Sequence, residues 1–333
     1  MKSFWLVLLW LLPVAAWPLD LCLPTGNDAL LRGDNAGFFQ PTVEGSVESG
    51  MFGCVRNGGH RLHKGIDIKC LQRDRHGEPL DPIHAVADGE VVFINTKPGL
   101  SNYGRYIVLE HRWDGVPVHT LYAHLSAIAD GLAAGQPVHK AQVIATMGHT
   151  SNTRERIAPE RAHLHFEIDL LLNPNFYVWY PKHDPQAPPF GNFNGKNLFG
   201  LDPAAVLKEF AGNPKLNFAD YVARQRVGFT VLVSARQFPW LRMHPEQVCQ
   251  PAQANATPVA YEIAVTPFGV PVTVWARTTA EVKPEQLRRL PVLNRVDEAE
   301  MAQACHHFLE RGRAGWHLSN AGREWVELLT CGQ

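Results

Sequence analysis

Polar and hydrophobic residues alternate along residues 163–168, where the sequence reads His-Leu-His-Phe-Glu-Ile. A period of two is typical of a half-buried β-strand, so a strand is predicted here. His163, His165 and Glu167 then share one face of the strand, and the apolar residues share the other. Two side chains at this spacing lie about 6–7 Å apart. That distance suits one metal ligand beside one group that acts on whatever the metal holds.

Further short strands are predicted along residues 43–168. Four stretches are rich in β-branched and aromatic residues and are separated by Gly, Pro, Asn or Asp: residues 90–94, 106–109, 120–124 and 143–146. No amphipathic run of helix length interrupts them. This part of the chain is therefore predicted to be an antiparallel β domain.

The C-terminal half has a mixed pattern and is predicted to be an additional α+β domain. Residues 173–203 are rich in Pro, Gly, Asn and aromatic residues and are expected to form a surface connector. Helices are predicted at residues 203–210, 218–226 and 297–311, and strands at residues 259–266 and 270–277. A capping box of Asp297 and Glu300 begins the last helix, which directs Cys305 into a core. The adjacent His306 and His307 are interpreted as surface residues, because their rings diverge on a helix.

A second pair of metal-binding side chains lies in residues 63–67, which read His-Lys-Gly-Ile-Asp. In an extended chain His63 and Asp67 would be about 13 Å apart, whereas the ligands of one zinc ion lie within about 4 Å of each other. The backbone must therefore bend, and Gly65 is placed to allow it. With one histidine of residues 163–168 they would make three protein ligands, the number found in catalytic zinc sites. His60 is the alternative to His63 as a ligand.

Several further segments complete a family resemblance. They are Gly53, residues 63–68, residues 87–92 (Ala-Asp-Gly-Glu-Val-Val), residues 122–126 (Tyr-Ala-His-Leu-Ser), residues 135–138 (Gly-Gln-Pro-Val) and residues 163–167. In this order they resemble the LytM/lysostaphin-type metallopeptidases, the M23 family of peptidoglycan endopeptidases. The resemblance spans residues 41–168, well under half of the chain. It implies a compact LytM-like fold in which an antiparallel β-sheet forms a groove.

The resemblance also implies roles for individual residues. One Zn²⁺ per chain would be held by His63, Asp67 and His165, with His124 and His163 as the catalytic pair. Zinc held in this way lowers the pKa of a bound water to about 7 and polarises an amide carbonyl, while the two histidines accept and donate protons. Glu167 is expected to support a ligand rather than to be one.

The implied substrate is the peptide cross-link of bacterial peptidoglycan, and the predicted function is an exported zinc metalloendopeptidase that hydrolyses amide bonds there. No residue encodes whether that bond joins D-Ala to a diamino acid or lies within a glycine bridge. Two alternatives stay open. Some members of the family have lost metal ligands, so one alternative is a non-catalytic LytM-like binding module that activates a cell-wall amidase. The other is a peptidase directed at proteins or at the walls of competitors.

Composition and the N-terminal residues indicate where the protein acts. The 31 Lys and Arg residues nearly balance the 32 Asp and Glu residues, so nothing indicates binding to nucleic acid. Lys2, the apolar residues 4–12 and the small residues that end at Ala16 form the pattern of an export signal. The apolar run is shorter than the roughly 20 residues that span a bilayer. We expect cleavage after Ala16 and a periplasmic or secreted product without a membrane anchor.

The expected organisation has five parts: a signal peptide (1–16), an N-terminal lead-in (17–40), the zinc peptidase domain (41–172), the connector (173–203) and the α+β C-terminal domain (204–333). A role for the last part in docking a protein partner is one of several that stay open. Whether the lead-in blocks the zinc through Asn27 or Asn35 also stays open.

Six cysteines in an exported chain indicate disulfides, with fifteen pairings available. Cys54 and Cys70 bracket the bend at residues 63–67. A bond between them would close a loop of about 15 residues, worth about 3 kcal/mol in the chain-entropy model. A second pair is expected among Cys249, Cys305 and Cys331.

Two loops, residues 70–81 and 149–162, exceed the length of an ordinary hairpin connection. Long loops beside a site commonly form the walls of a binding groove, and solvated insertions are the alternative. The second loop departs from the short connection usual in the family.

Overall fold

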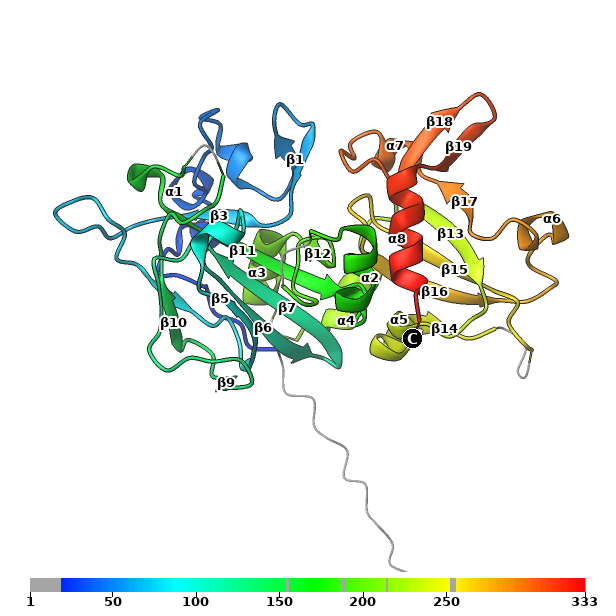
Figure 1. Cartoon of the computed structure of the whole chain (residues 1–333), viewed down its shortest axis with the longest axis horizontal. Helices are drawn as coiled ribbons and strands as arrows, with labels where there is room; N and C mark the ends of the chain where they lie inside the picture. The colour runs from blue at the N-terminus through cyan, green and yellow to red at the C-terminus, as the bar shows by residue number, and fades with distance from the viewer. Residues whose placement is uncertain (1–18, 154–155, 187–189, 214, 252–255, 333) are drawn as a thin grey trace, which may run out of the picture.

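The computed structural model describes residues 19–153, 156–186, 190–213, 215–251 and 256–332. The protein has two adjacent β-sheet regions, one built from β1–β12 and one from β13–β19 (Figure 1). The predicted class is confirmed, because the strands form mostly antiparallel sheets and the C-terminal region combines a sheet with helices. The predicted signal peptide, residues 1–16, lies outside the described residues.

The main sheet of the first region has the strand order β12-β11-β7-β6-β5-β9, and β3 also pairs with β11. Its strands are β3 (Ile66–Lys69), β5 (Gly89–Asn95), β6 (Tyr106–Trp113), β7 (Val116–Ala123), β9 (Pro137–Val138), β11 (His163–Leu171) and β12 (Leu198–Leu201). Every neighbouring pair is antiparallel. The predicted strands at residues 90–94, 106–109 and 120–124 correspond to β5, β6 and β7.

Strand β11 is the centre of this sheet. Its residue His165 lies opposite Asp67 of β3 on one side and Ala123 of β7 on the other. All nine residues of β11 are buried, so the prediction of a half-buried strand is wrong. The polar face is covered because strands and loops from elsewhere in the chain close over it, which periodicity along one segment does not reveal.

Smaller elements surround the main sheet. β1 (Gly53–Arg56) and β2 (Arg61–His63) form a hairpin, and β4 (Pro82–His84), β8 (Ala127–Ile128) and β10 (Val143–Thr146) form a second sheet. The short helices are η1 (Ala29–Arg32), α1 (Asn35–Phe38), η2 (Val47–Gly50), η3 (Pro98–Leu100) and η4 (Pro159–Arg161). The N-terminal segment runs along β3, where Phe39 bridges Ile68 and the Gln40 N–H donates to the Asp67 carbonyl at 2.7 Å.

The C-terminal region is built on a sheet of order β14-β16-β15-β13-β17. Its strands are β13 (Phe229–Ser234), β14 (Val248–Cys249), β15 (Ala260–Val265), β16 (Pro271–Arg277) and β17 (Val292–Val296), with a separate hairpin of β18 (Leu309–Gly312) and β19 (Gly315–Leu318). The helices are α3 (Pro203–Gly212), α4 (Phe218–Ala223), α5 (Pro239–Met243), η5 (Pro245–Gln247), α6 (Pro284–Leu287), α7 (Glu298–Met301) and α8 (Asn320–Thr330). Helix α8 lies across the sheet (Figure 1), and its Trp325 ring packs against Phe229 of β13.

Two predictions for this half of the chain are wrong. Residues 173–203 are more than a surface connector, because they contain α2 (Phe176–His183) and the buried strand β12, which extends the main sheet. The helix predicted at residues 297–311 stops at Met301 in α7, although Asp297 does cap it by accepting from the N–H groups of Ala299 and Glu300. Residues 302–308 form neither helix nor strand, and residues 309–312 pair with β19 as a hairpin. The hairpin and the disulfide of Cys305 with Cys54 override the local helical pattern.

The predicted cysteine pairs are also wrong. Cys54 of β1 forms a disulfide with Cys305, 251 residues further along the chain. Cys70 is free, and its thiol donates to the Asp81 carboxylate at 3.0 Å within its own loop. Cys249 and Cys331 are free as well. Proximity along the chain favoured Cys70 as the partner, but the fold brings the C-terminal region next to the β1–β2 hairpin instead.

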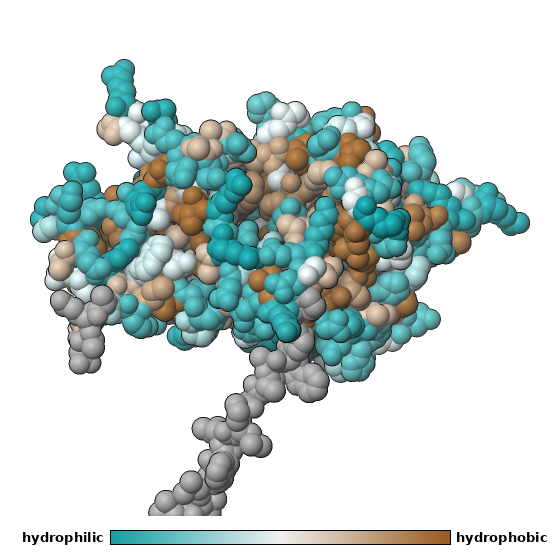
Figure 2. All heavy atoms as spheres, turned by 180° about the vertical axis from the view of Figure 1, so that it is seen from behind, coloured by the Kyte–Doolittle hydropathy of each residue, from teal (hydrophilic) through white to brown (hydrophobic). Residues whose placement is uncertain are grey.

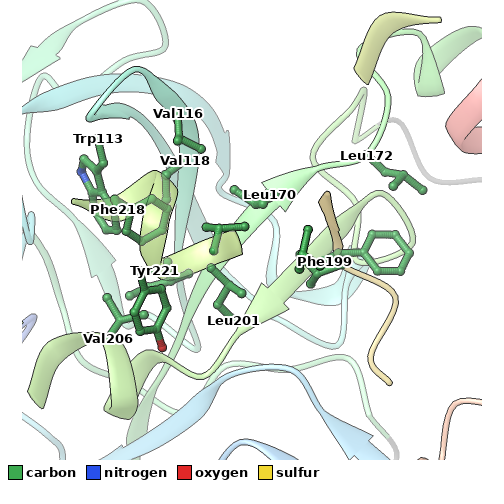
Figure 3. Close-up of a cluster of buried hydrophobic side chains, with 14 of the residues drawn as sticks. Trp113, Val116, Val118, Leu170, Leu172, Phe199, Leu201, Val206, Phe218 and Tyr221 are labelled. Atoms are coloured by element: carbon green, nitrogen blue, oxygen red, sulfur yellow. The ribbon is translucent and has the colours of Figure 1, made fainter. Parts of the chain in front are cut away.

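A buried hydrophobic cluster joins the main sheet to α3 and α4 (Figure 3). Trp113 of β6 meets Phe218 of α4 edge to face, with ring centroids 5.0 Å apart. Leu170 and Leu201 of the sheet face the same cluster. The first helices after residue 203 are therefore part of the core that supports β11. Seen from behind, the surface is mainly hydrophilic with several groups of apolar residues (Figure 2). Among the described residues no helix is long and apolar enough to cross a membrane.

Candidate metal centre

Three side chains from β2, β3 and β11 converge on one point. His63 ends β2, Asp67 lies in β3, and His165 lies opposite Asp67 in β11. His63 Nε2 and His165 Nδ1 are 3.0 Å apart, and Asp67 Oδ1 lies 3.1 Å from the first and 2.9 Å from the second. A tetrahedral zinc ion with bonds of about 2.0–2.1 Å would separate its ligand atoms by about 3.3–3.4 Å. The three atoms thus need to move by only a few tenths of an ångström to hold such an ion.

Hydrogen bonds on the far side of each ring fix the nitrogen that faces this point. Nδ1 of His63 donates to the Met51 carbonyl at 2.7 Å, so its Nε2 carries the free lone pair. Nε2 of His165 donates to Glu167 Oε1 at 2.8 Å, which leaves Nδ1 for a metal. Glu167 Oε1 also accepts from the Tyr103 hydroxyl at 2.8 Å. Carboxylates and carbonyls in these positions orient histidine ligands in metal sites generally.

Gly65 serves this geometry through close packing. It lies between His63 and Asp67 where the chain crosses the Phe166–Glu167 peptide of β11. A Cβ atom at this position would stand 2.4 Å from the Phe166 carbonyl oxygen and 2.9 Å from Glu167 Cγ. The residue was predicted to allow a bend, and the structure adds the reason why no larger side chain fits there.

His124 and His163 lie beside the three ligand candidates. Their rings are 4.9 Å apart between centroids, and the His124 ring is 5.8 Å from that of His165. Nδ1 of His124 donates to the Thr150 carbonyl and Nδ1 of His163 donates to the Arg161 carbonyl, each at 2.8 Å. Both Nε2 atoms are therefore proton acceptors. Burial lowers the pKa of each of these rings below its ordinary value, which favours the neutral, basic form.

These side chains lie in a segment that matches a known family: residues 61–174 match the model of peptidase family M23. This segment is called the M23 domain below, after the family model that it matches. No curated protein matches the chain. The catalytic domain of lysostaphin from Staphylococcus simulans is 25% identical over 48% of this chain and 87% of its own, with a TM-score of 0.29.

Two further solved structures are similar to the M23 domain. A zinc-containing peptidase from Vibrio cholerae is 29% identical, and the match covers 32% of this chain and 26% of that one, with a TM-score of 0.24. A putative glycyl-glycine endopeptidase LytM from Ruminococcus gnavus is 24% identical over 48% of this chain and 51% of its own, with a TM-score of 0.31. This chain therefore spans only about a quarter of the Vibrio protein and half of the Ruminococcus protein.

Arg56 reaches the centre of the M23 site, and the ligand spacing in the sequence did not predict it. Its Nη2 donates to Asp67 Oδ2 and lies 2.9 Å from His63 Nε2. Because a guanidinium has no lone pair to offer, it donates into the same lone pair that a metal would use on His63. A metal bound to His63 therefore displaces that contact, whereas the ion pair with Asp67 Oδ2 can persist. Arg56 belongs to β1, the strand that Cys54 ties to Cys305.

The predicted site residues line one pocket of about 490 Å³. They are His63, Asp67, His124, His163 and His165. Glu167 lies behind His165 and is absent from the lining, as expected for a supporting carboxylate. His60 is exposed and does not belong to the group of ligand candidates. Neither Asn27 nor Asn35 is among the described residues that line the pocket.

The two long loops have different relations to this pocket. Residues of the 149–162 loop form part of its wall, including Ser151, Arg156 and Ile157. The 70–81 loop supports that wall from behind: Arg73 donates to the Pro159 carbonyl at 2.6 Å and to the Glu160 carbonyl at 3.1 Å. The groove-wall interpretation is thus correct for the second loop, and the first loop acts as its support.

Proposed function

We propose that the chain is an exported zinc metalloendopeptidase that hydrolyses amide bonds in the peptide cross-links of peptidoglycan. The observation that supports this most directly is the group His63, Asp67 and His165, whose ligand atoms all lie within 4.8 Å of one another. Three ligands of this kind leave a position open for water or substrate. The match to peptidase family M23 supports the same reaction class.

Each residue of the site has a part in this proposal. When bound, the metal supplies Lewis acidity and a water of lowered pKa. His124 and His163 present neutral Nε2 atoms to the same pocket, so one can take a proton from the attacking water and the other can donate to the leaving amine or to the oxyanion. The Met51 carbonyl and Glu167 hold the ligand rings in the required tautomers.

The domain boundaries and the export signal are part of the same proposal. Residues 41–172 would be the peptidase domain, and cleavage after Ala16 would deliver it to the periplasm or the exterior. The buried contacts of α3 and α4 with the main sheet support a C-terminal region that stabilises the M23 domain in addition to any binding role.

The test compares metal content with hydrolysis. The mature protein is expected to hold about one zinc ion per chain and to release new peptide ends from peptidoglycan, and a chelated sample is expected to release none. His165→Ala should lose both zinc and activity, whereas His124→Ala should keep zinc and lose activity. His60→Ala is the matched control, because this exposed histidine lies three residues from a ligand candidate, and it should behave as the wild type.

The outcomes separate the competing functions. Wall hydrolysis that survives in His165→Ala would exclude the proposed metal-dependent reaction. Zinc bound without any cleavage would favour the binding module that activates an amidase. A wild-type chain that binds no zinc would contradict the assignment of all three ligands.

A further inference from the structure

The pocket of the M23 domain concentrates positive charge. Among the described residues, four arginines line it, Arg56, Arg61, Arg156 and Arg161, against two carboxylates, Glu44 and Asp67. Four positive charges minus two negative charges leave a surplus of two before any metal is counted. The whole chain carries a net charge of −1, so this surplus is a local feature rather than a result of composition.

Among the residues that the structure describes, one of the four arginines has an anionic partner. Arg56 pairs with Asp67. Within the described ranges, no carboxylate pairs with Arg61, Arg156 or Arg161. The Nε–H of Arg161 is buried and has no hydrogen-bond partner among the described residues. Burial of an unsatisfied donor costs free energy, so this guanidinium has hydrogen-bonding capacity that the described part of the chain does not use.

Arg161 is also held at a fixed place beside the reacting groups. It ends η4, and its carbonyl accepts from Nδ1 of His163 at 2.8 Å. Arg73 fixes the same short helix through the carbonyls of Pro159 and Glu160. The backbone of Arg161 is thus tied to a candidate catalytic histidine, and its side chain lines the same pocket as that histidine.

Guanidinium groups bind carboxylates through paired N–H donors, with directional preference as well as charge. We propose that Arg161, with Arg61 and Arg156 beside it, binds a carboxylate group of the substrate and makes the M23 domain selective for peptides that carry a free carboxylate next to the bond being cut. This inference rests on the proposed peptidase function. It favours a cross-link between residues with free carboxylates over a glycine bridge, which has none beside its internal amide bonds.

The test uses cross-linked peptide dimers with their carboxylates free or converted to carboxamides, and pentaglycine with an acetylated N-terminus and an amidated C-terminus as an uncharged third substrate. The wild type is expected to cleave the free dimer with a kcat/KM about tenfold above that for the amidated dimer. Arg161→Gln should raise KM for the free dimer about tenfold, keep kcat within a factor of two, and leave the amidated dimer unaffected. Dimers amidated on only the acyl side or only the amine side then identify which carboxylate is bound.

Controls separate this inference from folding and from the proposed function. Arg313→Gln makes the same charge change in an exposed turn between β18 and β19 and should leave kcat/KM for both dimers unchanged. Zinc content and the thermal unfolding midpoint are measured for every variant. If Arg161→Gln does not fold, the double variant Arg61→Gln/Arg156→Gln replaces it, because both of its side chains are exposed.

Binding of the same dimers to the zinc-loaded protein, measured by calorimetry, decides the inference even if nothing is cleaved. Tighter binding of the free dimer that is lost in Arg161→Gln supports it. Equal binding of free and amidated dimers, a preference for pentaglycine, or an equal loss for both dimers in Arg161→Gln overturns it. Absence of cleavage with selective binding contradicts only the peptidase function.

Discussion

Replacement of Gly65 by alanine tests how the proposed metal centre is assembled. The added Cβ would lie 2.4 Å from the Phe166 carbonyl oxygen, whereas real Cβ atoms essentially never come within 3.0 Å of such an atom. The chain must therefore move by about 0.6 Å, the difference between these distances. The carbonyl belongs to β11, where β3 pairs with it. The substitution therefore strains the pairing of β3 with β11, which places Asp67 opposite His165.

The size of this shift predicts the effect on metal binding. Metal–ligand distances in real sites stay within about 0.2 Å of their ideal values, so a shift about three times larger is not tolerated without loss. We expect Gly65→Ala to raise the zinc Kd about 10- to 100-fold, as changes in residues that orient metal ligands do. That range corresponds to about 1.4–2.7 kcal/mol of binding free energy.

The assay is competition for zinc with a chelating dye at neutral pH, together with circular dichroism to show that the variant is folded. Gly99→Ala is the matched control, because a Cβ there meets nothing within 4 Å. It should bind zinc as the wild type does. A folded Gly65→Ala protein with a zinc Kd within twofold of the wild type would refute the reasoning, because the ligands would then not depend on the close approach of β3 to β11.

Three further predictions concern regions outside the ligand group. Removal of the disulfide in Cys54→Ser/Cys305→Ser should lower the free energy of unfolding by up to about 5 kcal/mol, because the bond closes a loop with a sequence separation of 251. Urea denaturation of the oxidised proteins measures this free energy, and a change under 1 kcal/mol would contradict the chain-entropy account. Burial lowers the pKa of His111 to about 4 from an ordinary 6.5, so the unfolded chain takes up a proton at this ring first as the pH falls. The free energy of unfolding should therefore fall by about 3 kcal/mol between pH 6.5 and pH 4. His111→Gln should therefore lose less stability than the wild type between pH 6.5 and 4, and parallel curves would contradict this. Burial raises the pKa of the Cys70 thiol to about 11 from 9.0, so at pH 8 its thiolate fraction should be about 100-fold below that of an exposed thiol. Alkylation of the metal-free protein, followed by mass spectrometry, should be correspondingly slow. Labelling at the rate of a small-molecule thiol would show that the thiol is not held as the structure has it.

Local patterns correctly predicted five strands of the M23 domain, including its four longest. β5, β6, β7 and β10 follow from β-branched and aromatic runs between turn residues, and β11 follows from the alternation of polar and apolar residues. Strand formation in these segments agrees with the intrinsic preference of each segment. The same reasoning failed at residues 297–311. The helical pattern there was overridden by the β18–β19 hairpin, which is itself local, and by the disulfide that joins Cys305 to the distant Cys54.

The candidate site shows the same division. The spacing of His63 and Asp67, and of His163 and His165, predicted four of the side chains that line the pocket, since ligand types and strand periodicity are local properties. Arg56 carried no comparable signal, because its role depends on how the β1–β2 hairpin lies over β3. The positive charge of the pocket likewise arises from arginines of the hairpin and of the 149–162 loop, which are far apart in sequence.

The sequence by itself therefore determined the kind of chemistry that this protein is equipped for, because metal-ligating residues at strand spacing restrict the reaction class wherever the strands lie. Only the tertiary structure decided the rest: which nitrogen of each histidine is free, why Gly65 has no room for a side chain, and that Cys54 pairs with Cys305. These depend on carbonyls, strands and a thiol brought together across long stretches of chain. No local pattern encodes such contacts, because each partner is chosen by packing rather than by sequence distance.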